Sequence, residues 1–266
     1  MDRRRLLLLA GSGLVTVVAA ACGGKGGASA TTAAATTADA RTGTTTTAGA
    51  APGAALECVT EIPQETGGPY PGDGSNGPNV LTESGIVRQD IRSSFGSASG
   101  TAEGVPLTIE LTVVDAADGC TPLPGAAVYA WHCDRDGNYS LYSEAVAEEN
   151  YLRGVQVADE SGAVRFTSIY PGCYAGRWPH VHFEVYPTVD AATGPDEAVK
   201  TSQLAFPQDA CETVYATSGY ETSVSNLARL SLETDNVFGD DGGALQLATM
   251  GGSVDSGYTA TLVVGV

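Results

Sequence analysis

Positive charge is scarce in this chain of 266 residues. Lys and Arg together number 13 against 31 Asp and Glu, which gives a formal net charge of −18. Proteins that bind the phosphate backbone of DNA or RNA need clustered Lys and Arg on one face. The composition therefore excludes nucleic acid as a partner, while the 42% of hydrophobic residues is enough for a folded, soluble domain.

Long apolar runs are also missing. The one candidate, residues 6–21, is shorter than the roughly 20 residues that a membrane-spanning helix needs. Three arginines precede it, at residues 3–5, and small residues follow it up to Cys22. This layout is typical of a signal peptide, so we predict that residues 1–21 direct export.

The ends of this export segment suggest a route and an anchor. Residues 3–7, Arg-Arg-Arg-Leu-Leu, resemble a twin-arginine signal, which carries folded proteins across the membrane. Residues 19–24, Ala-Ala-Ala-Cys-Gly-Gly, resemble a lipoprotein cleavage box, so we expect lipidated Cys22 to attach the exported protein to the cell surface. The alternative is an ordinary signal peptide that is cut near Ala21 and leaves Cys22 as a plain thiol.

Low sequence complexity marks the next segment. Residues 26–55 are nearly all Ala, Thr and Gly, and such a stretch buries too little apolar area to offset its backbone entropy. We predict a disordered tether over residues 22–55 and a folded domain over residues 56–266.

Long helical periodicity is missing from the folded domain, and short strands take its place. Residues 107–113 alternate between apolar and polar side chains, which is typical of a half-buried strand. Further strands are expected at residues 126–133, 164–169, 179–186, 202–206 and 259–264, and short helices near residues 209–217 and 223–230. Gly and Pro separate these segments. The pattern predicts an all-β domain, an antiparallel β-sandwich or barrel with short helices and long loops.

Paired cysteine spacings of the kind that build four-thiolate zinc sites are missing as well. The six cysteines stand at positions 22, 58, 120, 133, 173 and 211. Export makes disulfides plausible among the last five. If Cys22 is lipidated, at least one of these five is unpaired or pairs between chains, and the sequence leaves the pairing open.

Histidine is rare, yet two of the three histidines are separated by one residue. In the predicted strand 179–186, alternation places His180, His182 and Glu184 on one face. Two imidazoles on the same face of a strand can converge on one metal ion. The alternative is a surface strand that merely carries histidine.

The sequence around these histidines resembles the intradiol ring-cleavage dioxygenases, the family of catechol 1,2-dioxygenase and protocatechuate 3,4-dioxygenase. Five strings in the same order carry the resemblance, over residues 58–206. They are G-G-P-Y at 67–70, W-H-x(4)-G-x-Y-S at 131–140, P-G-x-Y at 171–174, R-x-x-H-x-H at 177–182 and T-x-Q-x-x-F at 201–206.

The resemblance implies a set of site residues. The iron ligands fall on Tyr139, Tyr174, His180 and His182, with Tyr139 and His180 equatorial and the other two axial. Arg177 and Gln203 take the places of residues near the substrate. Without these motifs, each tyrosine would more simply be a packed ring, Arg177 a solvated surface residue and Gln203 an ordinary strand residue. Glu184 is a possible acceptor behind the ligands, whereas His132 is expected to be structural.

The implied ligand set suits ferric iron. A free tyrosine has a pKa of about 10, so a phenolate at neutral pH needs a strong positive charge nearby, and two phenolates in return favour Fe(III) over Fe(II). The resemblance implies that a catechol-type diol chelates this Fe(III), that Tyr174 is displaced, and that O2 opens the ring between the two hydroxylated carbons. The implied product is a cis,cis-muconate-type diacid.

Two other functions remain open at this point. One is a non-catalytic, exported β-sandwich binding module that keeps the metal site as a relic, and the other is a zinc or copper enzyme that uses the same four ligands. The chain also departs from the catechol-specific members, which carry an N-terminal helical segment where residues 26–55 are of low complexity. Trp178-Pro179 before the first histidine of the strand, and Cys173 beside Tyr174, depart from the family pattern too.

Overall fold

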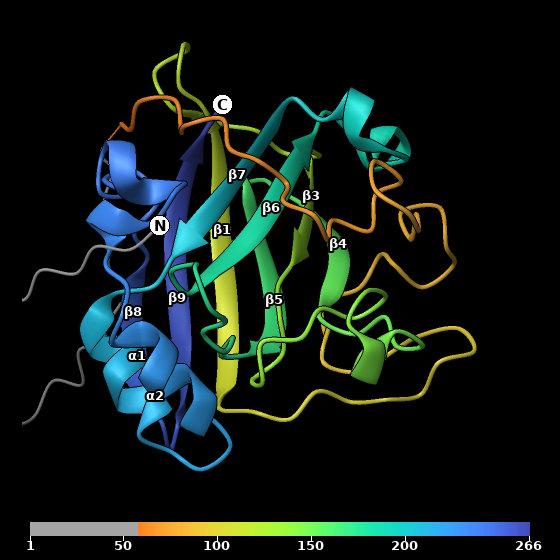
Figure 1. The fold of residues 1–266 in the computed structure, drawn as a ribbon. Helices are drawn as coiled ribbons and strands as arrows, with labels where there is room; N and C mark the ends of the chain where they lie inside the picture. The colour runs from red at the N-terminus through yellow and green to blue at the C-terminus, as the bar shows by residue number, and fades with distance from the viewer. Residues whose placement is uncertain (1–57) are drawn as a thin grey trace, which may run out of the picture. The chain divides into compact units, whose positions relative to one another are not determined.

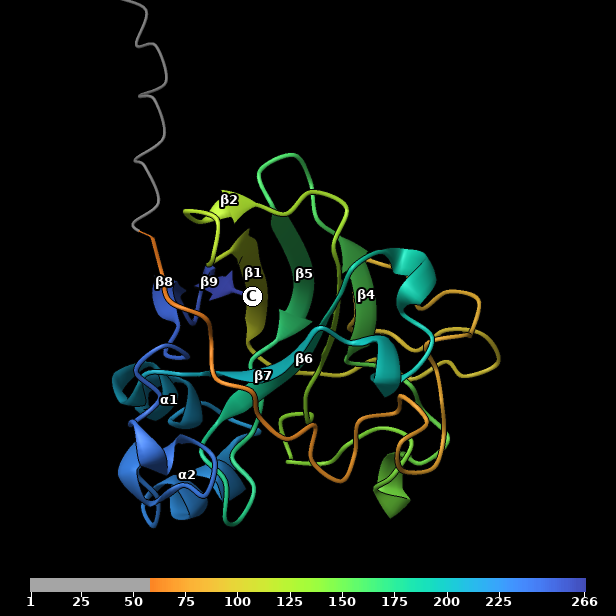
Figure 2. The same ribbon diagram turned by 90° about the horizontal axis from the view of Figure 1, so that it is seen from above.

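The computed structural model describes residues 58–266, and the predicted signal peptide (1–21), Cys22 and the tether (22–55) lie outside the described residues. Two β-sheets pack face to face, and two short helices lie together at one edge (Figures 1 and 2). The predicted sandwich-like β fold with short helices is confirmed. Within residues 58–266, no helix has both the length and the apolar character needed to cross a bilayer.

The elements are bounded as follows. The strands are β1 (Pro106–Asp115), β2 (Thr121–Pro122), β3 (Ala127–Trp131), β4 (Arg153–Val157), β5 (Ala163–Ile169), β6 (His180–Tyr186), β7 (Lys200–Ala205), β8 (Thr249–Ser253) and β9 (Gly257–Gly265). The α-helices are α1 (Gln208–Tyr215) and α2 (Glu221–Leu227). The 3₁₀ turns are η1 (Glu144–Val146), η2 (Val189–Ala191), η3 (Pro195–Glu197), η4 (Leu232–Thr234) and η5 (Phe238–Asp240).

One sheet is entirely antiparallel and the other holds one parallel pair. The four-stranded sheet has the order β4-β3-β6-β7. In the five-stranded sheet β1 pairs with β5 on one edge and with β9 on the other, and β9 runs parallel to β1. This pair differs from the antiparallel arrangement that the sequence predicts. It is possible because a long connection, which includes α1 and α2, separates β7 from the β8–β9 hairpin and lets the chain re-enter the sheet in the direction of β1.

Each of the six predicted strands overlaps an observed one, and both predicted helices form. The sequence analysis missed β2, β4 and β8. The strand β4 begins with Arg-Gly, which interrupts the apolar pattern, although Arg153 is buried. The strand β8 has the sequence Thr-Met-Gly-Gly-Ser on an exposed edge, where no buried face imposes an alternating pattern.

The two faces of the four-stranded sheet are both buried, but against different partners. Val181, Phe183 and Val185 of β6 join the sandwich core together with the inward face of β1. Burial of one such side chain contributes roughly 1.5–3 kcal/mol to stability. The opposite face of β6 carries His180 and His182, and it is buried as well. The sheet therefore has a hydrophobic core on one side and a polar, covered layer on the other.

A segment from the beginning of the described chain covers that polar layer. We call residues 64–73 the strap, and in Figure 1 this orange segment crosses in front of β7 and β6. The Glu65 N–H donates to the Thr201 carbonyl at 2.8 Å, and the Gln203 side-chain amide donates to the Thr66 carbonyl at 2.8 Å. These bonds fix the strap against β7.

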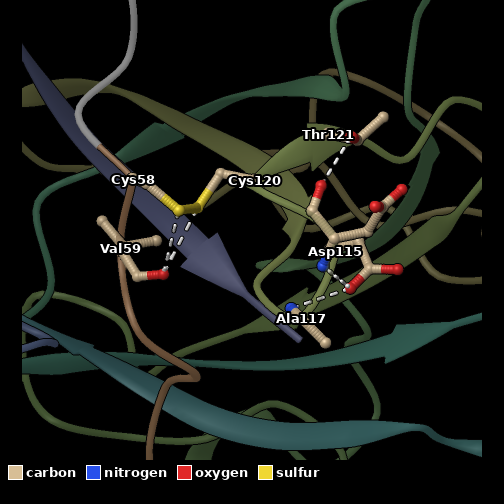
Figure 3. The surroundings of a disulfide bond; sticks show 7 residues. Cys58, Val59, Asp115, Ala117, Cys120 and Thr121 are labelled. Atoms are coloured by element: carbon tan, nitrogen blue, oxygen red, sulfur yellow. Dashed lines mark hydrogen bonds between the residues drawn. A yellow bond between two sulfur atoms is a disulfide. The ribbon is translucent and has the colours of Figure 1, made fainter.

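A disulfide fixes the chain just before the strap. Cys58 is bonded to Cys120 in the β1–β2 loop, beside the turn in which the Asp115 carboxylate accepts from the Ala117 N–H (Figure 3). The bridge closes a separation of 62 residues. In the chain-entropy account such a bridge stabilises the fold by about 4 kcal/mol. The remaining cysteines of the described part, Cys133, Cys173 and Cys211, are buried free thiols.

Candidate metal centre

The four side chains that the sequence analysis names as metal ligands come from three parts of the chain. His180 and His182 lie on β6 and point to the covered face of the sheet. Tyr139 lies in the loop between β3 and β4, and Tyr174 lies in the loop between β5 and β6. Both imidazoles and Tyr139 are buried, whereas Tyr174 is partly exposed. The fold therefore brings together residues that are up to 43 positions apart in sequence.

The polar atoms of these side chains converge on one point. Nε2 of His180 lies 3.0 Å from Nε2 of His182, 3.4 Å from the Tyr139 Oη and 3.3 Å from the Tyr174 Oη. Two atoms bonded to one transition-metal ion at about 2.0–2.1 Å lie about 2.9–3.5 Å apart when the angle at the ion is 90–120°. The three separations from Nε2 of His180 fall in this range, so each of the other three atoms is placed to share an ion with it.

The surroundings of the histidines set their tautomers and ring orientation. Nδ1 of His180 lies 2.5 Å from the Trp178 carbonyl, so Nδ1 carries the hydrogen and Nε2 presents a lone pair to the site. The ring of His182 stacks on Trp131 with centroids 4.9 Å apart and planes 4° apart. Nδ1 of His182 is buried and has no hydrogen-bond partner within residues 58–266.

Burial keeps this cluster uncharged. It lowers the pKa of His180 to about 3 and that of His182 well below its usual value, with the neighbouring Arg177 and His180 acting in the same direction. Burial likewise raises the pKa of Tyr174 to about 12 and that of Tyr139 well above its usual range. Neutral imidazoles are the form that binds metals, and a bound cation reverses the effect of burial on phenols by favouring the phenolate.

Two phenols and two imidazoles make an unusual candidate donor set. Residues 58–266 hold no group of three or more His, Cys, Asp or Glu arranged to bind a metal ion. Here two of the four donors are phenols, which bind as anions and so suit an oxidised ion such as Fe(III). The residues present fit ferric iron by chemistry as well as by spacing.

Gln203 and Arg177 meet beside the histidines. Gln203 stands directly opposite His182 in the β6–β7 register. Its side-chain oxygen accepts a 2.6 Å hydrogen bond from Nη2 of Arg177, while its amide holds the Thr66 carbonyl of the strap. The guanidinium of Arg177 also pairs with Asp235 at 3.0 Å. Asp235 further accepts from the backbone N–H groups of Trp178, at 2.7 Å, and Val237, at 2.8 Å.

An open cleft leads to the phenols. It has a volume of about 960 Å³, and its lining includes Tyr70, Tyr139, Tyr174 and Arg177. Arg177 is the charged residue of this lining, which otherwise consists of neutral side chains. A small aromatic molecule in the cleft would therefore meet the two phenol oxygens and one fixed positive charge.

The strap needs a glycine where it passes over the site. Gly68 has φ +70°, a conformation that favours glycine, and a Cβ built there would lie 3.3 Å from Cε1 of His182. The G-G-P-Y string of the sequence analysis thus marks the place where backbone packs on an imidazole ring.

Glu184 and His132 lie outside the cluster. Glu184 shares the histidine face of β6, but its carboxylate accepts a 2.7 Å bond from the Tyr186 hydroxyl. His132 is buried with Nε2 at 2.7 Å from the Ser168 hydroxyl and Nδ1 at 2.7 Å from the Cys133 carbonyl. Both nitrogens of His132 are thus engaged away from the site, as expected for a structural histidine.

Two residues that shape the site, Asp235 and Trp131, are not among the predicted site residues. Nothing in the local sequence distinguishes Asp235 from the other acidic residues, and 58 positions separate it from Arg177. Trp131 could have been found, because it lies in a predicted strand and directly opposite His182 once β3 and β6 are paired.

Comparisons with known proteins identify relatives of the chain. The family model described as "Dioxygenase" matches residues 76–227, which is more than half of the chain and includes all four donor residues. The solved structure of an intradiol ring-cleavage dioxygenase from Tetranychus urticae is similar, with a TM-score of 0.60 and 25% identity over 78% of this chain and 94% of that one.

Two curated relatives are similar over shorter stretches. A chlorocatechol 1,2-dioxygenase from Rhodococcus opacus is 44% identical over 54 residues, which is 20% of this chain and 21% of that protein. A catechol 1,2-dioxygenase from a Pseudomonas species is 40% identical over 53 residues, which is 20% of this chain and 17% of that protein. The chain thus spans about a fifth of the length of the curated relatives it matches.

The buried Arg177–Asp235 pair yields a prediction about stability and pH. Burial raises the pKa of Asp235, but hydrogen bonds from Arg177, Trp178 and Val237 outweigh this and leave it below its usual value of 3.8. Such a carboxylate stabilises the fold above its unfolded pKa, and the contribution is lost as pH falls through the lower, folded pKa. Removing one partner of a buried pair costs about 3–5 kcal/mol.

We therefore expect Asp235→Asn to lower the free energy of unfolding by about 3 kcal/mol at pH 7. The difference in the free energy of unfolding between Asp235→Asn and the parent protein should stay constant down to about pH 4 and shrink as the pH falls further. Urea unfolding between pH 7 and pH 2.5 measures it, with the exposed Asp255→Asn as the matched control. A difference that persists unchanged at pH 2.5 would contradict this account of Asp235.

Proposed function

Since the chain belongs to the intradiol ring-cleavage dioxygenase family, we propose that it is a non-haem Fe(III) enzyme that opens the ring of catechol-type substrates between the two hydroxylated carbons. Its co-substrate is O2, and the product is a cis,cis-muconate-type diacid that keeps both oxygen atoms of O2. The observation that carries the proposal is that two phenol oxygens and a second imidazole nitrogen lie within 3.0–3.4 Å of Nε2 of His180.

Tyr139, Tyr174, His180 and His182 would hold the iron. When bound, ferric iron supplies the positive charge that favours the anions of the phenols and of the diol, and so makes the substrate ring electron-rich toward O2. The chain's own contribution is to keep the imidazoles neutral and to aim all four donors at one point. Tyr139 is buried in the wall of the cleft and stays in place.

Tyr174 and Arg177 have separate tasks in this proposal. Tyr174 lines the cleft and is partly exposed, so its phenol oxygen is the donor placed to give way to a diol and to take up one of its protons. Arg177 presents a fixed guanidinium to the same cleft, held from behind by Asp235 and Gln203. A positive charge fixed in advance stabilises negative charge that builds up on the substrate ring.

Reconstitution with iron tests the proposal. We expect the purified protein to take up one equivalent of Fe(III) and to turn wine-red through tyrosinate-to-iron charge transfer. It should then consume O2 with at least one of catechol, hydroxyquinol and protocatechuate. Tyr174→Phe should change the absorption band and lose most of the turnover because it removes one of the two phenolates. Tyr258→Phe in β9, away from the site, is the matched control and should keep both.

The outcomes separate the alternatives. A protein that stays colourless and iron-free would contradict the enzyme and favour a binding module with a relic site. Tight binding of zinc or copper in place of iron would favour the second alternative. Full colour and full turnover in Tyr174→Phe would overturn the assignment of that ligand.

We also propose that the domain acts outside the cytoplasm, attached through Cys22. The Cys58–Cys120 disulfide supports this, because disulfides persist mainly in oxidising compartments. Three further cysteines remain as buried thiols, and burial raises the pKa of Cys173 and Cys211 to about 12. Thiols that are folded away before export escape oxidation, which fits the twin-arginine route.

Cell fractionation tests the export proposal. In a bacterium with a twin-arginine route, the protein should appear in the membrane fraction. Replacement of the arginines at positions 3–5 by lysine should leave it in the cytoplasm, whereas Arg41→Lys in the tether should have no effect. Equal export of all three proteins would contradict the twin-arginine assignment, and release of the parent in soluble form would contradict the lipid anchor.

A further inference from the structure

Arg153, the first residue of β4, is a buried cation outside the cluster of donors. Arg153 is 1% exposed, and within residues 58–266 it forms no ion pair. Burying a charge is unfavourable unless hydrogen bonds satisfy it. All of its hydrogen bonds go to neutral oxygen atoms, so the identity of those partners indicates what the buried charge is for.

The partners of Arg153 lie on three different segments. Nη2 donates to the Tyr70 carbonyl of the strap and to the Ser140 carbonyl, both at 2.9 Å. Nη1 donates to the Pro71 carbonyl at 2.7 Å and to the Tyr129 hydroxyl at 3.2 Å. Nε donates to the Ser140 hydroxyl at 3.1 Å. One guanidinium thus joins the strap, the residue after Tyr139, and β3.

Each of these segments contacts, or is linked through the chain to, one of the four proposed iron ligands. Ser140 is the neighbour of Tyr139 in the chain, and the ring of Tyr70 packs on that of Tyr139 with centroids 5.1 Å apart. On β3 the Tyr129 ring stacks on Trp131, which in turn stacks on His182, both at 4.9 Å. Arg153 therefore reaches one phenol through its loop and one imidazole through a stack of rings.

The backbone around Arg153 is held in conformations that most residues avoid. Leu141 has φ 72° and Leu152 has φ 58°, and these leucines directly follow Ser140 and precede Arg153. Left-handed backbone is unfavourable for leucine and persists only where the surroundings impose it. Gly72 of the strap has φ +71°, and a Cβ there would lie 2.9 Å from Nη1 of Arg153. The strap passes so close to the guanidinium that it needs glycine.

From these contacts we propose that Arg153 is a positioning residue. It clamps the strap and the Tyr139 loop (residues 138–144) together and so sets where the Tyr139 oxygen meets the imidazoles. The planar guanidinium suits this role because it directs five N–H groups at carbonyls on separate segments, which a lysine ammonium with three donors does not match. The inference rests on the proposed function in treating the four donors as an iron site, but the clamp itself is a property of the metal-free protein.

Arg88 supplies a matched control for the test. It is another arginine that donates to backbone carbonyls, those of Ser93, Asn150 and Arg153, and it lies over the Phe95 ring. It holds the backbone carbonyl of Arg153, but its side chain forms no hydrogen bond with the strap or with residues 138–144 around Tyr139. Arg88→Met therefore removes a comparable set of hydrogen bonds without removing the clamp.

The first measurement is hydrogen exchange of the metal-free, full-length protein under conditions in which each variant is folded. Arg153→Met should raise exchange at least tenfold in both residues 66–73 and residues 138–144, and Arg88→Met should leave both segments within twofold of the parent. The second measurement is Fe(III) affinity by competition with citrate, together with the charge-transfer band. Arg153→Met should bind Fe(III) at least tenfold more weakly and shift the band, Arg153→Lys should lie between, and Arg88→Met should match the parent.

Each result bears on the clamp. The clamp would be contradicted if Arg153→Met kept the hydrogen exchange and the Fe(III) affinity of the parent. It would also be contradicted if Arg88→Met changed both quantities as much as Arg153→Met does. If Arg153→Met does not fold, Arg153→Lys decides: exchange raised above the parent in both segments supports the clamp, and parent-like exchange in both contradicts it. If the parent protein binds no iron, the proposed function fails, while the exchange measurement still decides the role of Arg153.

Discussion

The two imidazoles of β6 and two phenols from loops can share one ion only if those loops cover the histidine face of β6, and this requirement shapes the surrounding structure. Covering a polar face normally costs stability, because buried donors and acceptors lose water. Here almost every polar atom on the covered face has a hydrogen-bond partner. The Trp178 carbonyl, for example, accepts a hydrogen bond from Nδ1 of His180. The Nδ1 of His182 is an exception within the described residues, and that ring is held by stacking on Trp131.

The sandwich supplies a rigid support, and the covering segments bring the other side chains of the candidate site to it. Behind β6, the packed faces of the two sheets hold the strand in place, so that the spacing of His180 and His182 is fixed by the pleat of the strand. In front of it, the strap and two loops bring Tyr139, Tyr174 and Arg177 from elsewhere in the sequence. Arg153 in β4 and Asp235 just after η4 are buried charges that hold these loops. Arg153 donates to the carbonyl of Ser140, which follows Tyr139, and Asp235 accepts from the N–H of Trp178, two residues before His180.

The sequence predicts the parts of this arrangement that follow a local period. Alternation in residues 179–186 places both histidines on one face, and the strands that form the sheets have the same signature. The resemblance to known dioxygenases names the two tyrosines. The features that the sequence does not predict depend on contacts between remote segments. Asp235 binds Arg177 across 58 positions, and β9 pairs parallel to β1. The strand β4 begins with Arg153, a charged residue that is buried. No pattern in the sequence marks such residues, because their roles are set by neighbours that are remote in the chain.

In the proposed site, the Oη atoms of Tyr139 and Tyr174 and the Nε2 atoms of His180 and His182 surround one ion. A crystal structure of the iron-loaded, substrate-free protein, with anomalous scattering recorded at the iron absorption edge, tests this arrangement. We expect one strong peak with all four atoms at bonding distance, about 2.0–2.2 Å. A peak elsewhere in the domain, or iron that leaves either tyrosine unbound, would contradict it.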